Sequence, residues 1–179
     1  MRNFEYCQYT YRHRRAFEYV VQKLFEPGSA EYQEMMKRAC AHDVDKLIMY
    51  QCGSKDEASK IHKSIASHHM SNTIPKSYYD KLEAVIDYEC AGYTKPDKPL
   101  NAWDTIKRFQ AMGEDETLCT ELLQICEEYG LTGSYRVTET DTIGIHSLSI
   151  FSEVTEQMIC DDIMSYFRHC HQNDTESVS

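Results

Sequence analysis

The chain has 179 residues, 41% of them hydrophobic, and is therefore long and apolar enough to bury one sizeable core. Lys and Arg number 19 against 29 Asp and Glu, and this formal charge of −10 argues against binding duplex nucleic acid or lying on an anionic membrane. No apolar run approaches the roughly 20 residues that span a bilayer, and the opening MRNFEYCQYTYRHRR lacks the features of a secretory signal, so we expect a cytoplasmic protein.

The first part of the chain predicts two long helices. Residues 4–25 repeat apolar side chains at helical spacing, and His13 lies one turn before Phe17 on the same inward face. The motif EPGS then ends this helix. The next helix is expected to run unbroken from about residue 30 to residue 51 (30–51), with Asp43 turned toward the interior.

Three histidines follow on one predicted helix, which spans roughly residues 55–71 and ends at the motif NTIP. On a continuous helix, His62 and His69 would lie two turns apart, about 10 Å along the axis. That separation is too large for the two rings to share one ion. One of the histidines could then serve a second metal or bind a substrate phosphate.

The remainder of the chain predicts more helices and one segment of a different kind. Helices are expected at about 76–92, 100–112, 116–129 and 153–170. Residues 134–150 are rich in Thr, Ile and Val with glycine punctuation and resemble a small β-hairpin, which could act as a lid or as the interface of a homodimer. The pair Asp161-Asp162 is predicted to lie on a solvated face. We expect a single all-α domain over 1–171 and a disordered tail over 172–179.

The eight cysteines do not form a C-x-x-C pair, and their spacing is irregular. Cys40, Cys90, Cys119 and Cys126 lie among apolar residues of the predicted helices. Buried, reduced thiols are therefore a better interpretation than disulfides or a cysteine metal site.

The stretch CAHDVDK brings charged groups into an otherwise inward-facing helix. On a helix, His42 and Asp43 differ in direction by about 100°, but a long imidazole and a short carboxylate can converge on an ion between them. Lys46 lies one turn further along and could hold an anionic ligand of that ion. The alternative is a helix cap or a buried ion pair with Lys46.

A metal at this position needs further ligands from other helices, since nitrogen and oxygen donors suit Mn, Fe, Co, Ni or Zn with roughly four to six ligands. His13 is the first candidate because it faces inward. Asp87, beside the apolar stripe of its helix, is the second. Asp104 is its rival, because Asp87 also shares a polar stripe with Asp80 and Glu83 and could be exposed.

The motif AHDVDK, with an upstream histidine and a downstream aspartate, resembles the signature of the HD-domain metal-dependent phosphohydrolases, a superfamily of all-α bundles. The resemblance implies that His13, His42, Asp43 and Asp87 bind a divalent metal whose water attacks a phosphoester. It also implies that Lys46 contacts the phosphate.

The chain is more closely similar to a branch of small, uncharacterised bacterial HD-type proteins. The likeness covers about residues 10–95 and includes a His-x-x-x-Asn element, here His68 to Asn72, and the acidic helix LEAVIDYECAGY. The chain departs from the commoner HDxGK pattern at Asp45, where the family often has glycine. This substitution adds a negative charge near Lys46.

The resemblance implies an HD-like bundle that acts as a divalent-metal-dependent phosphohydrolase on a nucleotide or other small phosphoester. We expect one transition metal, with Lys46, His68 and His69 balancing charge on the phosphoryl oxygens. A second metal is left open, because two-metal members of the family use two additional histidines. One alternative is a non-catalytic metal- or ligand-binding module, which Asp45 favours. Another is a di-iron oxidative enzyme, which would require His62 together with His68 or His69 as ligands.

Overall fold

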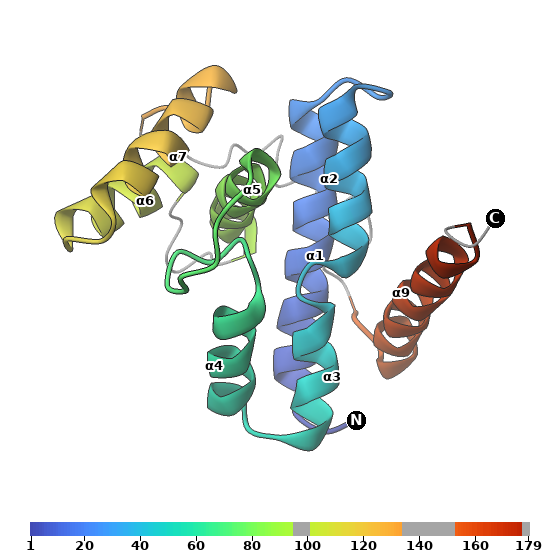
Figure 1. The fold of residues 1–179 in the computed structure, drawn as a ribbon. Helices are drawn as coiled ribbons and strands as arrows, with labels where there is room; N and C mark the ends of the chain where they lie inside the picture. The colour runs from blue at the N-terminus through green and yellow to red at the C-terminus, as the bar shows by residue number, and fades with distance from the viewer. Residues whose placement is uncertain (95–100, 134–152, 177–179) are drawn as a thin grey trace.

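The structure is a computed structural model that describes residues 1–94, 101–133 and 153–176, and within these ranges the only regular elements are helices (Figure 1). In chain order they are α1 (Phe4–Leu24), α2 (Ala30–Ala41), α3 (Val44–Cys52), α4 (Lys55–Ile65), α5 (Tyr78–Thr94), α6 (Ala102–Ala111), α7 (Glu116–Glu128) and α9 (Glu156–Glu176). The all-α prediction is confirmed for this part of the chain. The hairpin predicted at 134–150 lies outside the described residues.

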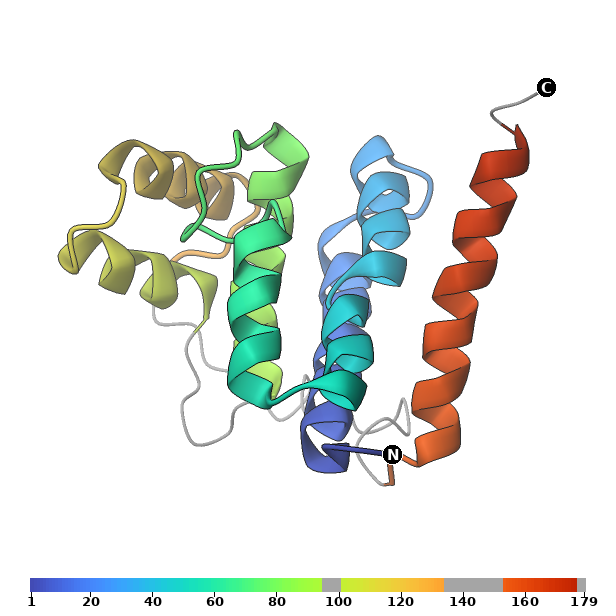
Figure 2. The same cartoon turned by 60° about the horizontal axis from the view of Figure 1, so that its bottom comes forward.

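The helices pack around α1 and α5, which lie against each other at the centre of the molecule. On one side, α6 and α7 cover α5. On the other side, α2 and α3 lie along α1, and α9 packs against all three as the outermost helix (Figure 2). The fourth helix, α4, packs against α3. None of the described helices combines the length and apolar character needed to cross a membrane.

The main core joins the apolar stripes that helical spacing predicts. Phe17 and Val21 of α1 are fully buried against Leu82 and Ile86 of α5, and α7 adds Leu122. Burying each such side chain contributes roughly 1.5–3 kcal/mol. This packing fixes α1 and α5 side by side, and these two helices carry His13 and Asp87.

A smaller apolar cluster lies at the other end of α1. It combines side chains from α1, α3, α4 and α9 with one from the segment before α9: Cys7, Leu47, Tyr50, Ala58, Ile159 and Val154. The cluster anchors α3 and α4 to α1. All eight cysteines are free, and Cys90, Cys119 and Cys126 are buried as predicted, but Cys40 is only half-buried.

Four predicted features of the helices are corrected. The helix expected over 30–51 is broken after Ala41, and the helix expected over 55–71 ends at Ile65. The third correction concerns Asp162, which is predicted on a solvated face but is buried and accepts hydrogen bonds from Arg14 and Arg15. The last helix also continues to Glu176, into the segment expected to be a tail.

Candidate metal centre

The His42-Asp43 pair lies in the break between α2 and α3. His42 ends α2, and Asp43 adopts the left-handed conformation, with φ 58° and ψ 6°. This conformation costs a non-glycine residue roughly 1–2 kcal/mol, although aspartate tolerates it better than most. The buried guanidinium of Arg14 donates to the carbonyl oxygens of Cys40 and His42, and thereby holds the break. The prediction of an unbroken helix fails here because a tertiary contact outweighs the local pattern.

The four predicted metal ligands converge at this break. His13 Nε2 on α1 lies 2.7 Å from Asp87 Oδ1 on α5, 3.4 Å from His42 Nε2 and 3.9 Å from Asp43 Oδ2. His42 Nε2 lies 3.6 Å from Asp87 Oδ1. Ligands about 2.1 Å from a tetrahedral ion are about 3.4 Å apart. The separations of 3.4, 3.6 and 3.9 Å are close to this value, while the 2.7 Å between His13 and Asp87 is that of a hydrogen bond. We call these four residues the first group.

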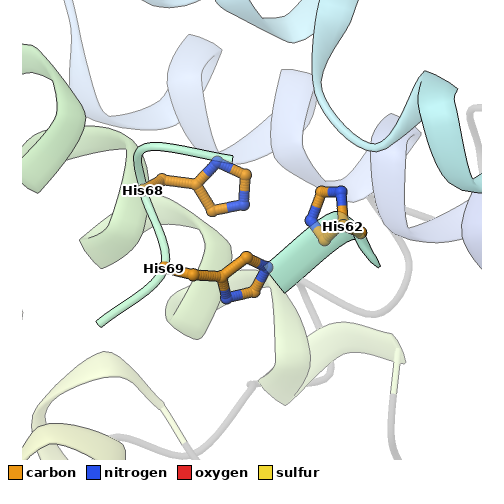
Figure 3. Close-up of side chains that lie close together, drawn as sticks. All are labelled: His62, His68 and His69. Carbon is orange, nitrogen blue, oxygen red and sulfur yellow. The ribbon is translucent and has the colours of Figure 1, made fainter. Parts of the chain in front are cut away.

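A second group consists of His62, His68 and His69, and their rings gather around a common space (Figure 3). One ligand atom from each residue lies within 4.8 Å of those of the other two. The prediction that His62 and His69 are too far apart is wrong, because α4 ends at Ile65 and the chain turns through the extended residue Ala66. As a result, the ring centroids of His62 and His69 are only 4.7 Å apart.

The turn after α4 is held by two polar side chains. The amide of Asn72 donates to the carbonyl oxygens of Lys63 (2.9 Å) and Ala66 (2.7 Å). Lys76 Nζ donates to the carbonyl oxygen of Ser67 (2.7 Å) and to Asn72 Oδ1 (3.1 Å). The asparagine of the His-x-x-x-Asn element therefore fixes the loop that brings His68 and His69 to His62.

Asp43 faces both groups with different oxygen atoms. Its Oδ2 faces His13 and pairs with Lys46 Nζ at 2.8 Å, while its Oδ1 lies 3.0 Å from His62 Nε2. Asp43 occupies the N-cap position of α3, yet its side chain accepts no capping hydrogen bond. The predicted ion pair with Lys46 is present, and the cap is not.

Carboxylates contact the Nδ1 atoms of His42, His62 and His68. Asp45 Oδ2 lies 2.8 Å from His62 Nδ1, and Glu83 Oε1 lies 3.0 Å from His42 Nδ1 and 3.1 Å from His68 Nδ1. Two further sets are close enough to hold an ion: His42, His68 and Glu83 form one, and Asp43, Asp45 and His62 form the other. However, Glu83 and Asp45 already lie at the distances of charge-assisted hydrogen bonds from the Nδ1 atoms.

Sequence reasoning did not identify Glu83 as a site residue. The sequence feature that could have identified it is its position one turn before Asp87 on α5. Glu83 shares with Asp80 and Asp87 the polar stripe that the sequence suggested could be exposed. The rival ligand Asp104 lies in the first turn of α6 and belongs to neither group.

The charges in the two groups are strongly coupled. Burial alone would raise the pKa of Asp43, but His42, Lys46 and His62 outweigh it and hold this pKa well below its ordinary value. The pKa of Asp87 is lowered in the same way, chiefly by His13 and His42 against the effect of burial. Burial would lower the pKa of His42, but the surrounding carboxylates raise it to about 10. The site therefore favours positive charge at its centre.

His69 differs from the other histidines. Burial and the neighbouring His68 lower the pKa of His69 to about 3, so its ring is neutral over the physiological range. A neutral imidazole is the form that binds a metal ion.

Several polar atoms that face the space between the groups have no hydrogen-bond partner. Among the described residues, these buried atoms include Asp43 Oδ1 and the Nε2 atoms of His62, His68 and His69. The 3.0 Å contact between His62 Nε2 and Asp43 Oδ1 is an ion-pair distance without hydrogen-bond geometry. Leaving a buried polar atom unpaired costs about 1–3 kcal/mol, so the arrangement is one that a bound cation would relieve.

Comparison with known proteins gives no relative: no family model, no curated protein and no solved structure matches the chain.

Proposed function

We propose that this chain is an HD-type, divalent-metal-dependent phosphohydrolase acting on a nucleotide or other small phosphoester. The observation that carries the proposal is a buried set of atoms without a hydrogen-bond partner, Asp43 Oδ1 and the Nε2 atoms of His62, His68 and His69, beside the four residues of the first group. Buried polar atoms in proteins are nearly always paired. Nitrogen and oxygen atoms of this kind are the ligands that bind divalent transition metals.

The donor set fits two divalent transition metals. In this proposal, His13, His42, Asp43 and Asp87 hold the first ion. His62, His68 and His69 would hold the second, and Asp43 would be shared, since its two oxygen atoms face different groups. The sequence favoured a single ion because it placed His69 far from His62, and the short distances in the second group favour two. Imidazole and carboxylate ligands suit Mn, Fe, Co, Ni or Zn.

The charges support an anionic substrate. Divalent ions at this position would supply an activated water and polarise a phosphoryl oxygen. Lys46 Nζ forms an ion pair with Asp43 Oδ2 at 2.8 Å, and 19% of the Lys46 side chain is exposed. Its ammonium group therefore lies at the edge of the first group, where it can contact the phosphoryl oxygens of a substrate. In this arrangement, His68 and His69 are assigned as ligands and no longer as phosphate-binding residues.

The di-iron oxidative enzyme is a second candidate function, and one observation favours it. It requires His62 with His68 or His69 as ligands, and these three side chains do lie together. The non-catalytic module loses the feature that favoured it, because Asp45 pairs with His62 Nδ1 and is not a surplus charge beside Lys46.

The test compares the native chain with the variant carrying His42→Ala and Asp43→Ala. Each protein is reconstituted separately with Mn, Co, Zn or, without oxygen, Fe, and its metal content is measured by elemental analysis. We expect two equivalents in the native chain and none in the double variant, because Asp43 serves both ions. His169→Ala on α9 removes a histidine outside both groups and should keep two equivalents.

Activity is then measured as turnover of a panel of nucleotides and small phosphoesters, together with oxygen uptake by the iron-loaded protein. Metal-dependent phosphoester hydrolysis that is lost in the double variant would support the proposal. A native chain without stoichiometric metal would overturn it. Two irons with oxygen uptake and no phosphoester turnover would favour the oxidative enzyme instead.

A further inference from the structure

Glu83 is the only acidic side chain among the described residues whose single oxygen atom contacts histidines from both groups. Its Oε1 lies 3.0 Å from Nδ1 of His42, in the first group, and 3.1 Å from Nδ1 of His68, in the second. Because an ionised carboxylate can only accept hydrogen bonds, both rings must carry their proton on Nδ1. When each ring is neutral, its Nε2 atom is then the one that can bind a metal.

The position of Glu83 is itself fixed by a salt-bridge network. Arg38 on α2 donates from Nη1 to Glu83 Oε2 (2.9 Å) and to Asp80 Oδ1 (2.8 Å). Arg38 Nε also donates to Glu34 (2.9 Å). Glu83 is buried, with only 7% of its surface exposed, so its two oxygen atoms have separate tasks: Oε2 anchors the side chain, and Oε1 faces the rings.

We infer that Glu83 is a positioning residue shared by both proposed ions, so that one side chain determines the affinity for each of them. This inference rests on the proposed function, because it takes the two groups to be metal ligands. A metal-bound histidine usually donates its other N–H to a carboxylate, which fixes the ring and raises its basicity. Here a single oxygen atom does so for one ligand of each ion.

The substitution Glu83→Gln tests this role without changing the size of the side chain. A glutamine has one accepting oxygen and one donating NH2 group. If the oxygen faces the histidines, the NH2 group meets the Arg38 guanidinium, which is also a donor. If the oxygen faces Arg38, the NH2 group meets Nδ1–H of both rings. Either orientation places a donor against a donor, and the second drives the ring protons toward the Nε2 atoms.

The measurement is a calorimetric titration of the metal-free protein with zinc, resolved into two equivalents. We expect Glu83→Gln to weaken both equivalents by about 10- to 100-fold. Glu34→Gln is the matched control, because it makes the same chemical change to another carboxylate on Arg38 and contacts neither group. Long-range proton–nitrogen NMR spectra of the zinc-loaded native protein should show the proton of His42 and His68 on Nδ1, because a neutral ring bound through Nε2 carries its proton there. A ring of either residue that lacks a proton on Nδ1 would overturn the assignment.

A second variant, Glu83→Asp, keeps the charge and shortens the side chain, so it should weaken both equivalents even if the glutamine variant is unstable. Native-like affinity for both equivalents in either folded variant would overturn the shared role. So would the loss of one equivalent alone, which would indicate that Glu83 is itself a ligand. If the native chain binds no zinc, both the proposed function and this inference fail. If the native chain binds two zinc ions and the Glu83 variants bind them equally well, only this inference fails.

Discussion

Asp43 combines a left-handed backbone with a carboxylate whose two oxygen atoms face different groups of histidines. In a continuous helix its side chain would point toward one side only. Residues held in sparsely populated backbone conformations persist where their surroundings determine them, and they cluster at functional sites. At this position the surroundings are the Arg14 guanidinium on the preceding carbonyl and the Lys46 ammonium on the side chain.

Asp45 provides a prediction at the residue scale. Replacing it with alanine removes the carboxylate from His62 Nδ1 and should weaken the second zinc equivalent by about 10- to 100-fold. The first equivalent should stay within about twofold, because Asp45 contacts no ring of the first group. Calorimetry separates the two effects. Asp56→Ala, a substitution in the first turn of α4 at an exposed position, is the control, and equal loss of both equivalents would contradict the assignment.

At the scale of elements, α9 reaches the candidate site through an ion pair. Arg14 donates to Asp162 of α9 through Nε (2.7 Å) and Nη2 (3.1 Å), and the same guanidinium donates to the carbonyl of His42. Arg14 follows His13 in the chain and is almost fully buried. The outermost helix is thus connected, through one side chain, to the break that carries His42 and Asp43.

Replacing Asp162 with alanine should therefore do more than loosen α9. The change leaves the Arg14 charge buried with fewer partners, and breaking a buried ion pair in this way typically costs about 3–5 kcal/mol. Urea unfolding measures the total loss, and amide exchange should show lost protection at both α9 and residues 40–44. Asp161→Ala, at the exposed neighbouring position, should change stability by less than about 0.5 kcal/mol. Unchanged exchange at 40–44 would show that Arg14 holds the break without Asp162.

The loop after α4 provides a second prediction at this scale. Asn72→Ala removes two hydrogen bonds to the carbonyl oxygens that end α4, at a cost of about 1–3 kcal/mol. Because His68 and His69 lie on this loop, the second zinc equivalent should weaken while the first is retained. Ser71→Ala, at an exposed neighbouring residue, is the control. A titration in which Asn72→Ala binds both equivalents normally would show that the loop keeps its shape without this side chain.

Across the whole molecule, an apolar core and a charged site lie side by side on the same helices. Phe17, Leu82 and Ile86 hold α1 against α5 without any contribution from a metal. The site adds carboxylates whose charge is balanced by histidines when no metal is bound, and this balance makes the stability of the metal-free protein depend on pH.

His42 sets the sign of that dependence. Burial opposes its protonation, but Asp43, Asp87 and Glu83 raise its pKa from 6.5 to about 10. Its contribution to stability is therefore fully present below pH 6.5 and declines as the pH rises, by at most about 1.4 kcal/mol per pH unit. Asp43 and Asp87 have lowered pKa values, so their contribution is present above their ordinary value of 3.8 and is lost below it.

We expect the chelator-treated protein to be most stable between about pH 4 and 6.5 and to lose stability toward pH 9. Urea unfolding at successive pH values measures this change. The zinc-loaded protein should not show the alkaline decline, because the bound metal keeps His42 neutral throughout. His42→Gln should flatten the curve of the metal-free protein. A native metal-free protein of constant stability from pH 6.5 to 9 would contradict the assignment.

The sequence by itself determined the helical class and the apolar stripes of α1, α5 and α7, because a periodic apolar face must be buried. It also named the four residues of the first group as candidates, with Asp104 as a rival to Asp87, and the structure brings these four together. His13 was found because it shares a face with Phe17. The identity of the superfamily and the reaction are not determined by that spacing and remain proposals.

Tertiary structure decided the second group and the residues that orient both groups. The end of α2 depends on Arg14, whose hydrogen bond to His42 competes with helix continuation only once α1 is packed against the break. The end of α4 depends on Asn72, which lies nearby in the chain, but no local pattern in the sequence shows that its amide turns back onto Ala66. Glu83 and Asp162 belong to stripes that look solvated in the sequence, and only the packing of α2 on α5 and of α9 on α1 buries them. A sequence pattern predicts that a charged residue is exposed, because the pattern does not show the partner that makes burial of the charge favourable.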